Sequence, residues 1–152
     1  MADTVQGYFF GTSYNEHENG RPAGLAGYAI PDLGIIFRSR HEGNIHECQY
    51  TGLLELLKFI DLNKKSFKGL EFEILSDSAL VIYQISHRRF ISRDLAPFYS
   101  AAVEYKKKIS YRVSWVPREE NVALIGMSGD PAIRPDFDIQ FTFPSGDSIG
   151  PA

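Results

Sequence analysis

The chain has 152 residues, of which 43% are hydrophobic and 23% charged, so it is long enough for one folded domain with its own core. Its net charge of −3 excludes a strongly basic nucleic-acid binder, and no apolar run reaches the ~18 residues that a membrane-spanning helix needs. Cys48 is the single cysteine, which excludes an internal disulfide and predicts a reducing, cytoplasmic compartment.

The first forty residues predict three strands. An aromatic and apolar segment over residues 7–14 forms the first, residues 25–31 the second and residues 34–40 the third. A tight turn at Asp32–Gly34 joins the second and third strands into a hairpin.

The hydrophobic pattern then changes from the spacing of a strand to that of a helix. Apolar residues at i, i+3, i+4 and i+7 predict an amphipathic helix over residues 45–62. Asn44 and Glu47 stand three residues apart at its start, which predicts an N-cap residue paired with an N3 carboxylate. The apolar residues at this spacing are Leu53, Leu56, Leu57 and Ile60.

The second half of the chain alternates strands and helices. We predict a strand over 70–75, a helix over 79–86 that residues 76–78 cap, a helix over 94–108 and a strand over 111–116. Trp115 in the last strand is expected in the core. Three antiparallel strands followed by this alternation predict an α/β fold with a mixed five-stranded sheet flanked by helices.

The C-terminal part differs in composition from the rest. We expect one domain over residues 1–122 and a divergent extension over 123–152, rich in glycine and proline. Its alternating aromatic segment 137–143 predicts an extra strand, which could pair with a sheet edge of the same molecule or of a second copy in a homodimer. The end of the chain, residues 144–152, is expected to be disordered.

The motifs, taken in order over roughly residues 5–122, resemble the short, handle-less form of ribonuclease H type 1. The WVPREEN motif is the most specific of them. The matching segments are FFGTS (9–13), GRPAGLAGYAI (20–30), Asn44 to Glu47, ILSDSALVIYQI (74–85), DLAPFYSAAVEYKKKI (94–109) and WVPREEN (115–121).

This resemblance implies a site in which four carboxylates hold two Mg²⁺ or Mn²⁺ ions and cleave the RNA of an RNA/DNA hybrid. Glu47 stands at the position of the helix carboxylate and Asp77 at that of the fourth-strand carboxylate. Phe10 replaces the first-strand aspartate, which bridges both metals in the family, and Ile125 replaces the last aspartate. Asp130, five residues further on, is a candidate substitute ligand. We therefore expect that two-metal catalysis is lost.

Several of these residues have a structural interpretation beside the functional one. Glu47 and Asp77 suit the first turn of a helix, and Asn44 suits an N-cap. The family resemblance instead implies that Asn44 contacts the nucleic-acid backbone near a 2′-hydroxyl. The basic residues Arg88, Arg89 and Arg93 are either a solvated face or contacts to phosphates.

The sequence is compatible with three functions. The first is a domain that has lost catalysis and binds an RNA/DNA hybrid or structured RNA. The second is an active, Mg²⁺- or Mn²⁺-dependent hybrid nuclease with displaced carboxylates. The third is a protein-interaction module that retains only the fold.

Overall fold

The computed structural model describes residues 3–18, 20–89 and 92–126, without the side chains of residues 15–18. Within this part, no helix is long and apolar enough to cross a lipid bilayer. The strand predicted over 137–143, the homodimer contact expected from it and Asp130 all lie outside the described residues.

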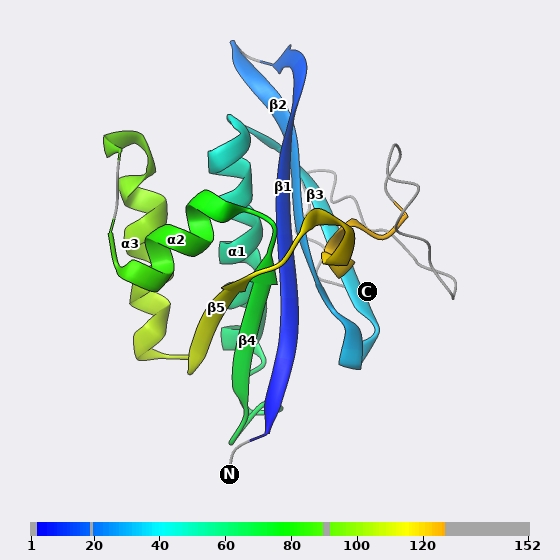
Figure 1. Ribbon diagram of the computed structural model, residues 1–152, viewed down its shortest axis with the longest axis vertical. Helices are drawn as coiled ribbons and strands as arrows, with labels where there is room; N and C mark the ends of the chain where they lie inside the picture. The colour runs from blue at the N-terminus through cyan, green and yellow to red at the C-terminus, as the bar shows by residue number, and fades with distance from the viewer. Residues whose placement is uncertain (1–2, 19, 90–91, 127–152) are drawn as a thin grey trace.

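A five-stranded mixed sheet with the strand order β3-β2-β1-β4-β5 forms the centre of the molecule (Figure 1). Strands β1 (Thr4–Glu18), β2 (Arg21–Ile30) and β3 (Ile35–Glu42) pair in antiparallel fashion. Strand β4 (Glu71–Ser76) pairs parallel to β1, and β5 (Tyr111–Trp115) pairs parallel to β4. The predicted fold class and the predicted order of elements are confirmed.

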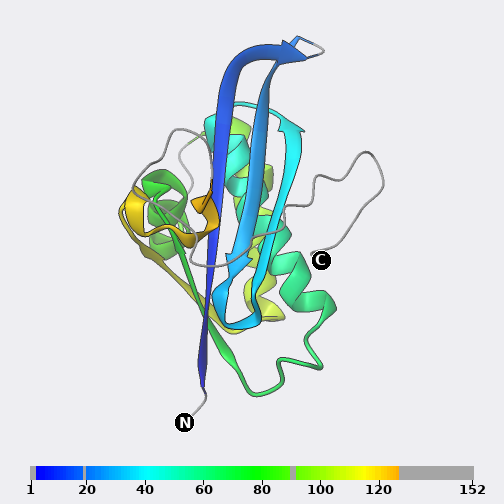
Figure 2. The same ribbon diagram turned by 90° about the vertical axis from the view of Figure 1, so that its right-hand side faces the viewer.

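In the described part of the chain, three α-helices cover the sheet. Helix α1 (Ile45–Leu62) has the predicted bounds, α2 spans Ala79–His87, and α3 (Ala96–Glu104) lies beside α1. Helix α3 is shorter than predicted, because 3₁₀ turns stand at both of its ends. Figures 1 and 2 show α1 and α3 on one side of the sheet, while the segment after β5 crosses to the other side.

Neighbouring residues of β1 belong to two separate apolar clusters, because successive side chains of a strand point to opposite faces. Phe9 is fully buried in the main core with Tyr50 and Leu53 of α1. Phe10 belongs to a smaller cluster with Leu124, which follows β5 in the chain. The central strand therefore has an apolar layer on each face.

The first turns of α1 lie directly on the backbone of β1. A Cβ atom at Gly11 would stand 2.2 Å from the backbone carbonyl carbon of Cys48, and one at Gly52 would stand 2.3 Å from the carbonyl oxygen of Phe10. Only glycine permits this approach at either position. It fixes where the start of the helix, and with it Glu47, sits relative to β1.

Two local predictions are wrong. Trp115 was expected in the core, but 55% of its surface is exposed, because β5 is an edge strand and this residue lies at its end. Ser78 is the N-cap residue of α2, yet no side chain caps that helix. Asp77 instead uses its carboxylate in a contact with a distant residue.

Candidate functional site

Phe10 and Ile125, which stand where the resemblance implies carboxylates, lie in the same apolar cluster. We call it the Phe10 cluster, and only 3% of the surface of Phe10 itself is exposed. A phenyl ring and aliphatic side chains thus fill the space beside these positions. The buried members are Phe10, Leu25, Ala29, Ala123 and Leu124, and the partly buried ones are Tyr8, Ile36, Val122 and Ile125.

A buried cation borders this cluster. Arg38 of β3 is 2% exposed, and its guanidinium carbon lies 5.6 Å from the centre of the Phe10 ring. Its Nη2 donates hydrogen bonds of 2.7 Å to the carbonyl oxygens of Ala123 and Ile125. Burial lowers the pKa of Arg38 to about 10, so it stays protonated at neutral pH. This side chain therefore fixes the segment after β5 and places a positive charge beside Phe10.

Asp77 is held next to β1 by a buried asparagine. Asn121 is 0% exposed, and its Nδ2 donates to Oδ1 of Asp77 (2.7 Å) and to the carbonyl oxygen of Phe9 (2.9 Å). The backbone N–H of Ala123 donates to Oδ1 of Asn121 at 3.1 Å. One side chain thus joins β1, the end of β4 and the turn that carries the Phe10 cluster. In the sequence, Asn121 stands out only as the last residue of the WVPREEN motif.

Glu47 has the predicted role at the start of α1. Its backbone N–H donates to Oδ1 of Asn44, and the N–H of Asn44 donates to Oε1 of Glu47, both at 2.9 Å. This reciprocal pair is a capping box, which confirms the predicted N-cap.

The carboxylate of Glu47 also forms an ion pair that the sequence did not suggest, with Nη2 of Arg21 at 2.6 Å. Burial raises the pKa of Glu47, but the hydrogen bonds from Arg21 and from the backbone of Asn44, together with the charge of Arg21, outweigh this and lower it. Its contribution to stability is therefore present above its unfolded pKa and is lost as the pH falls through the folded pKa. The carboxylate of Glu47 is thus paired with Arg21, whereas that of Asp77 is bound by Asn121.

The donor atoms at the four positions where the resemblance implies carboxylates do not match the needs of a two-metal centre. Mg²⁺ prefers oxygen ligands, but two of the four positions hold hydrocarbon, and a cation borders them. Among the described residues, no group of three or more His, Cys, Asp or Glu could hold a metal ion. These side chains therefore do not fit a pair of bound metal ions.

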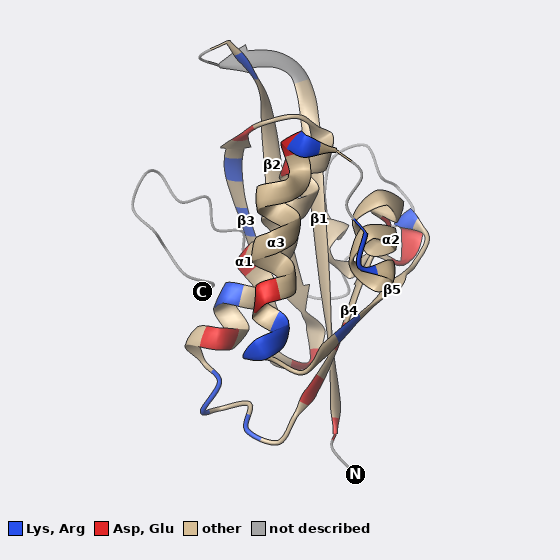
Figure 3. Ribbon diagram, turned by 90° about the vertical axis from the view of Figure 1, so that its left-hand side faces the viewer, with Lys and Arg blue, Asp and Glu red and all other residues tan. Residues whose placement is uncertain are grey.

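The basic residues after α2 are exposed. Arg88 ends the helix in the left-handed region, with φ of 55°, and its N–H donates to the carbonyl oxygen of Gln84. Arg89 donates its backbone N–H to the same oxygen, and Arg93 begins the turn before α3. In Figure 3, Lys and Arg lie in separate short segments, one of them between α2 and α3.

No family model matches the sequence. The fold is similar to the ribonuclease H1 of the halophilic archaeon Halobacterium salinarum NRC-1, with a TM-score of 0.58 and 23% identity over 78% of this chain and 89% of that one. An N-terminal ribonuclease H domain from Mycobacterium tuberculosis matches with a TM-score of 0.55 and 22% identity over 77% of this chain and 86% of that one.

A third similar structure is the ribonuclease H1 called LC11, determined in complex with an RNA/DNA hybrid. Its TM-score is 0.61, with 15% identity over 77% of this chain and 88% of that one. Another structure of LC11, isolated from compost by a metagenomic approach, matches with a TM-score of 0.63. The chain therefore has the fold of a type 1 ribonuclease H, as its motifs implied.

Proposed function

We propose that this domain binds RNA/DNA hybrids or other RNA-containing duplexes and does not cleave them by the two-metal mechanism. The observation that carries the proposal is the Phe10 cluster with its bordering cation. A metal-bridging carboxylate would have to stand where Phe10 packs against Leu124, and the guanidinium of Arg38 would lie beside the metals. A dication close to a fixed guanidinium is disfavoured by like-charge repulsion.

Three further observations support the binding half of the proposal. The fold is shared with a protein that was crystallised with an RNA/DNA hybrid. Asn44 is exposed at the start of α1, and capping uses its side-chain oxygen, so its amide nitrogen can donate to a nucleic acid. Arg88, Arg89 and Arg93 supply exposed cations for phosphates.

The active-nuclease alternative depends on a displaced carboxylate such as Asp130. That residue would have to act beside a position already filled by Phe10. The protein-interaction alternative predicts no salt-dependent affinity for a duplex. Both alternatives are outcomes of the experiments below.

Replacing Arg88 and Arg89 with alanine should weaken binding to a short, labelled RNA/DNA hybrid roughly tenfold, since each of the two exposed ion contacts contributes up to about 1 kcal/mol and a factor of ten corresponds to about 1.4 kcal/mol. The slope of log affinity against log salt should fall by roughly 0.9 for each phosphate that the variant no longer neutralises, independently of the hybrid's sequence. Fluorescence anisotropy at several KCl concentrations measures both quantities.

The matched control replaces Lys64 and Lys65 with alanine, which removes the same charge from the connector between α1 and β4. An equal loss of affinity in both double variants would mean that net charge, not the segment after α2, governs binding. Absence of any salt-dependent binding in the parent protein would contradict the proposal and favour the protein-interaction module.

A second test reintroduces the missing carboxylates. The double variant Phe10→Asp with Ile125→Asp should bind Mn²⁺ more tightly than the parent in titration calorimetry. The gain should stay small, because Arg38 can pair with a carboxylate at position 10. Adding Arg38→Met should increase Mn²⁺ affinity further, by about tenfold, because it removes the positive charge that repels the metal and competes for the carboxylates. It also removes the hydrogen bonds to the carbonyls of Ala123 and Ile125, so circular dichroism first verifies that the variant is folded.

The control carries Phe10→Asn, Ile125→Asn and Arg38→Met, with amides of nearly the same size in place of the carboxylates. It should not gain Mn²⁺ affinity. If the folded triple variant with the aspartates also gains nothing, then Glu47 and Asp77 do not converge on position 10.

A further inference from the structure

The residue that ends α2 has a backbone conformation that disfavours a side chain. Arg88 lies in the left-handed region, with φ of 55° and ψ of 42°, whereas every other described residue with a positive φ is glycine. A side chain costs free energy there, because its Cβ atom comes too close to the following carbonyl oxygen. Glycine would end the helix with less strain, so the arginine points to a use of its side chain.

The turn after α3 holds a second cation in a fixed place. Nζ of Lys106 donates a hydrogen bond of 2.7 Å to the carbonyl oxygen of Tyr111 and lies 4.0 Å from the centre of the Tyr111 ring. The hydroxyl of Tyr111 donates to the carbonyl oxygen of Ala102, so the ring is itself held in place. An ammonium group has three N–H donors, and two of them remain for a ligand.

Arg88 and Lys106 are neighbours although they belong to different elements. Helix α2 packs against both α3 and β5, and Figure 3 shows the basic segments after α2 and after α3 on the side that faces the viewer. Burial lowers the pKa of Lys106, and the positive charge of Arg88 lowers it further. The same charge opposes the rise that burial causes in the pKa of Tyr111. Charges act in this way only over short distances, so the guanidinium lies close to both groups.

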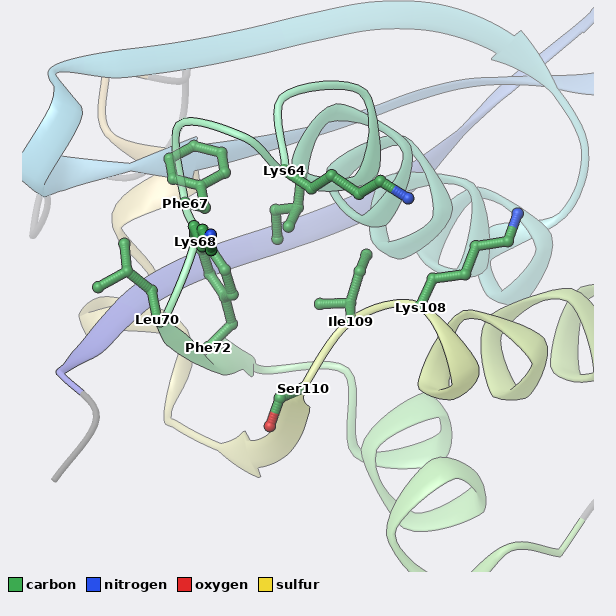
Figure 4. Close-up of a pocket in the computed structure, with 10 residues that line it drawn as sticks. Lys64, Phe67, Lys68, Leu70, Phe72, Lys108, Ile109 and Ser110 are labelled. Carbon is green, nitrogen blue, oxygen red and sulfur yellow. The ribbon is translucent and has the colours of Figure 1, made fainter.

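Among the side chains that the structure describes, no carboxylate pairs with Arg88 or Lys106. Lys107, by contrast, pairs with Glu104 at 3.2 Å. Lys108 lines a separate hollow beside the end of α1, and Figure 4 shows its side chain pointing toward α1 and away from α2. The like charges of Arg88 and Lys106 repel each other, and an anion bound between them would relieve this repulsion.

We propose that Arg88 and Lys106 together bind one phosphate group, which is a backbone phosphate when a duplex is bound; this last point rests on the proposed function. A guanidinium binds phosphate oxygens through two parallel hydrogen bonds, and the ammonium adds a point charge. Helix α2 has nine residues and is therefore about 14 Å long. A duplex that reaches Asp77 and runs along this helix has the contacting phosphate about four nucleotides away, at about 3.4 Å per nucleotide.

The first test identifies this phosphate. RNA/DNA hybrids that carry one uncharged methylphosphonate linkage, moved along the strand position by position, are titrated with the protein at several KCl concentrations. At the contacting position, the parent protein should lose about tenfold in affinity, and the slope of log affinity against log salt should fall by roughly 0.9. The double variant Arg88→Ala with Lys106→Met should bind that modified hybrid and the unmodified one equally, because it forms the contact with neither.

Variants at position 88 separate the side chain from the backbone. Arg88→Gly and Arg88→Ala should weaken hybrid binding equally, about fivefold, because both remove the guanidinium. Only glycine relieves the left-handed strain, so the midpoint of thermal unfolding of Arg88→Gly should lie about 3 °C above that of Arg88→Ala.

Lys107→Met is the charge-matched control for Lys106→Met, and it should weaken hybrid binding less. Methionine at position 106 keeps an apolar stem over the ring of Tyr111, so the variant should remain folded, and circular dichroism verifies this. If the hybrid binds, the proposal is overturned when no linkage loses its effect in the double variant. It is also overturned when the two methionine variants weaken binding equally.

Titration of the ¹⁵N-labelled protein with inorganic phosphate separates this site from the proposed function. If no duplex binds, but millimolar phosphate shifts the amides of residues 88, 89 and 106 in the parent and not in the double variant, the phosphate site is correct and the proposed function is wrong. If no duplex binds and phosphate shifts none of these amides, the phosphate site is overturned as well.

Discussion

An RNA/DNA hybrid incubated with the purified protein and Mg²⁺ or Mn²⁺ is expected to be cleaved at least about 1,000-fold more slowly than by a type 1 ribonuclease H with four carboxylates. A factor of this size corresponds to about 4 kcal/mol less transition-state stabilisation, a reasonable cost for the ligand that bridges two metals. The measurement is a single-turnover assay with protein in excess over an end-labelled hybrid.

The variants Asp77→Asn and Asp130→Asn identify the source of any cleavage that is measured. A trace rate that persists unchanged in Asp77→Asn would come from a contaminant. A fast, metal-dependent rate that Asp77→Asn abolishes would contradict the proposed loss of catalysis. If Asp130→Asn also abolished such a rate, the displaced-carboxylate alternative would be correct.

The variant Asn121→Ala should lower the free energy of unfolding by about 3 kcal/mol. The substitution removes the partners of two backbone groups, the carbonyl of Phe9 and the N–H of Ala123, and each unsatisfied buried group costs about 1–3 kcal/mol. It also frees the carboxylate of Asp77. Urea denaturation followed by circular dichroism provides the measurement.

Asn44→Ala is the matched control. It removes an exposed asparagine that caps the N-terminus of α1, and it should lower the free energy of unfolding by about 1 kcal/mol. The variant Asn121→Asp places a second carboxylate beside Asp77. Burial and the charge of Asp77 should raise the pKa of this new carboxylate in the folded state. The loss in free energy of unfolding should therefore be largest at neutral pH and should decrease as the pH falls. Equal losses for Asn121→Ala and Asn44→Ala would contradict the central role of Asn121.

Local elements could be predicted from the sequence because their determinants are close together in the chain. The bounds of α1 follow from apolar residues repeated every three or four positions, and its cap joins Asn44 to Glu47, which are 3 residues apart. The mixed sheet follows from short loops that join antiparallel strands and helical connections that join parallel ones. The placement of Trp115 failed because alternation along a strand does not say whether that strand lies at an edge.

For the candidate site, too, the sequence predicted some features and only the tertiary structure determined the others. The sequence by itself predicted Glu47 and Asp77 as retained carboxylates and Phe10 and Ile125 as substituted positions, since the first three lie in linear motifs and Ile125 lies four residues after the last motif. Only the tertiary structure placed Phe10 and Ile125 in one apolar cluster and added the side chains that hold it. Arg38 bonds to a carbonyl 85 residues away, and Asn121 to one 112 residues away. Such pairings depend on which strands become neighbours and which face each side chain occupies, and no local pattern of residues encodes either choice.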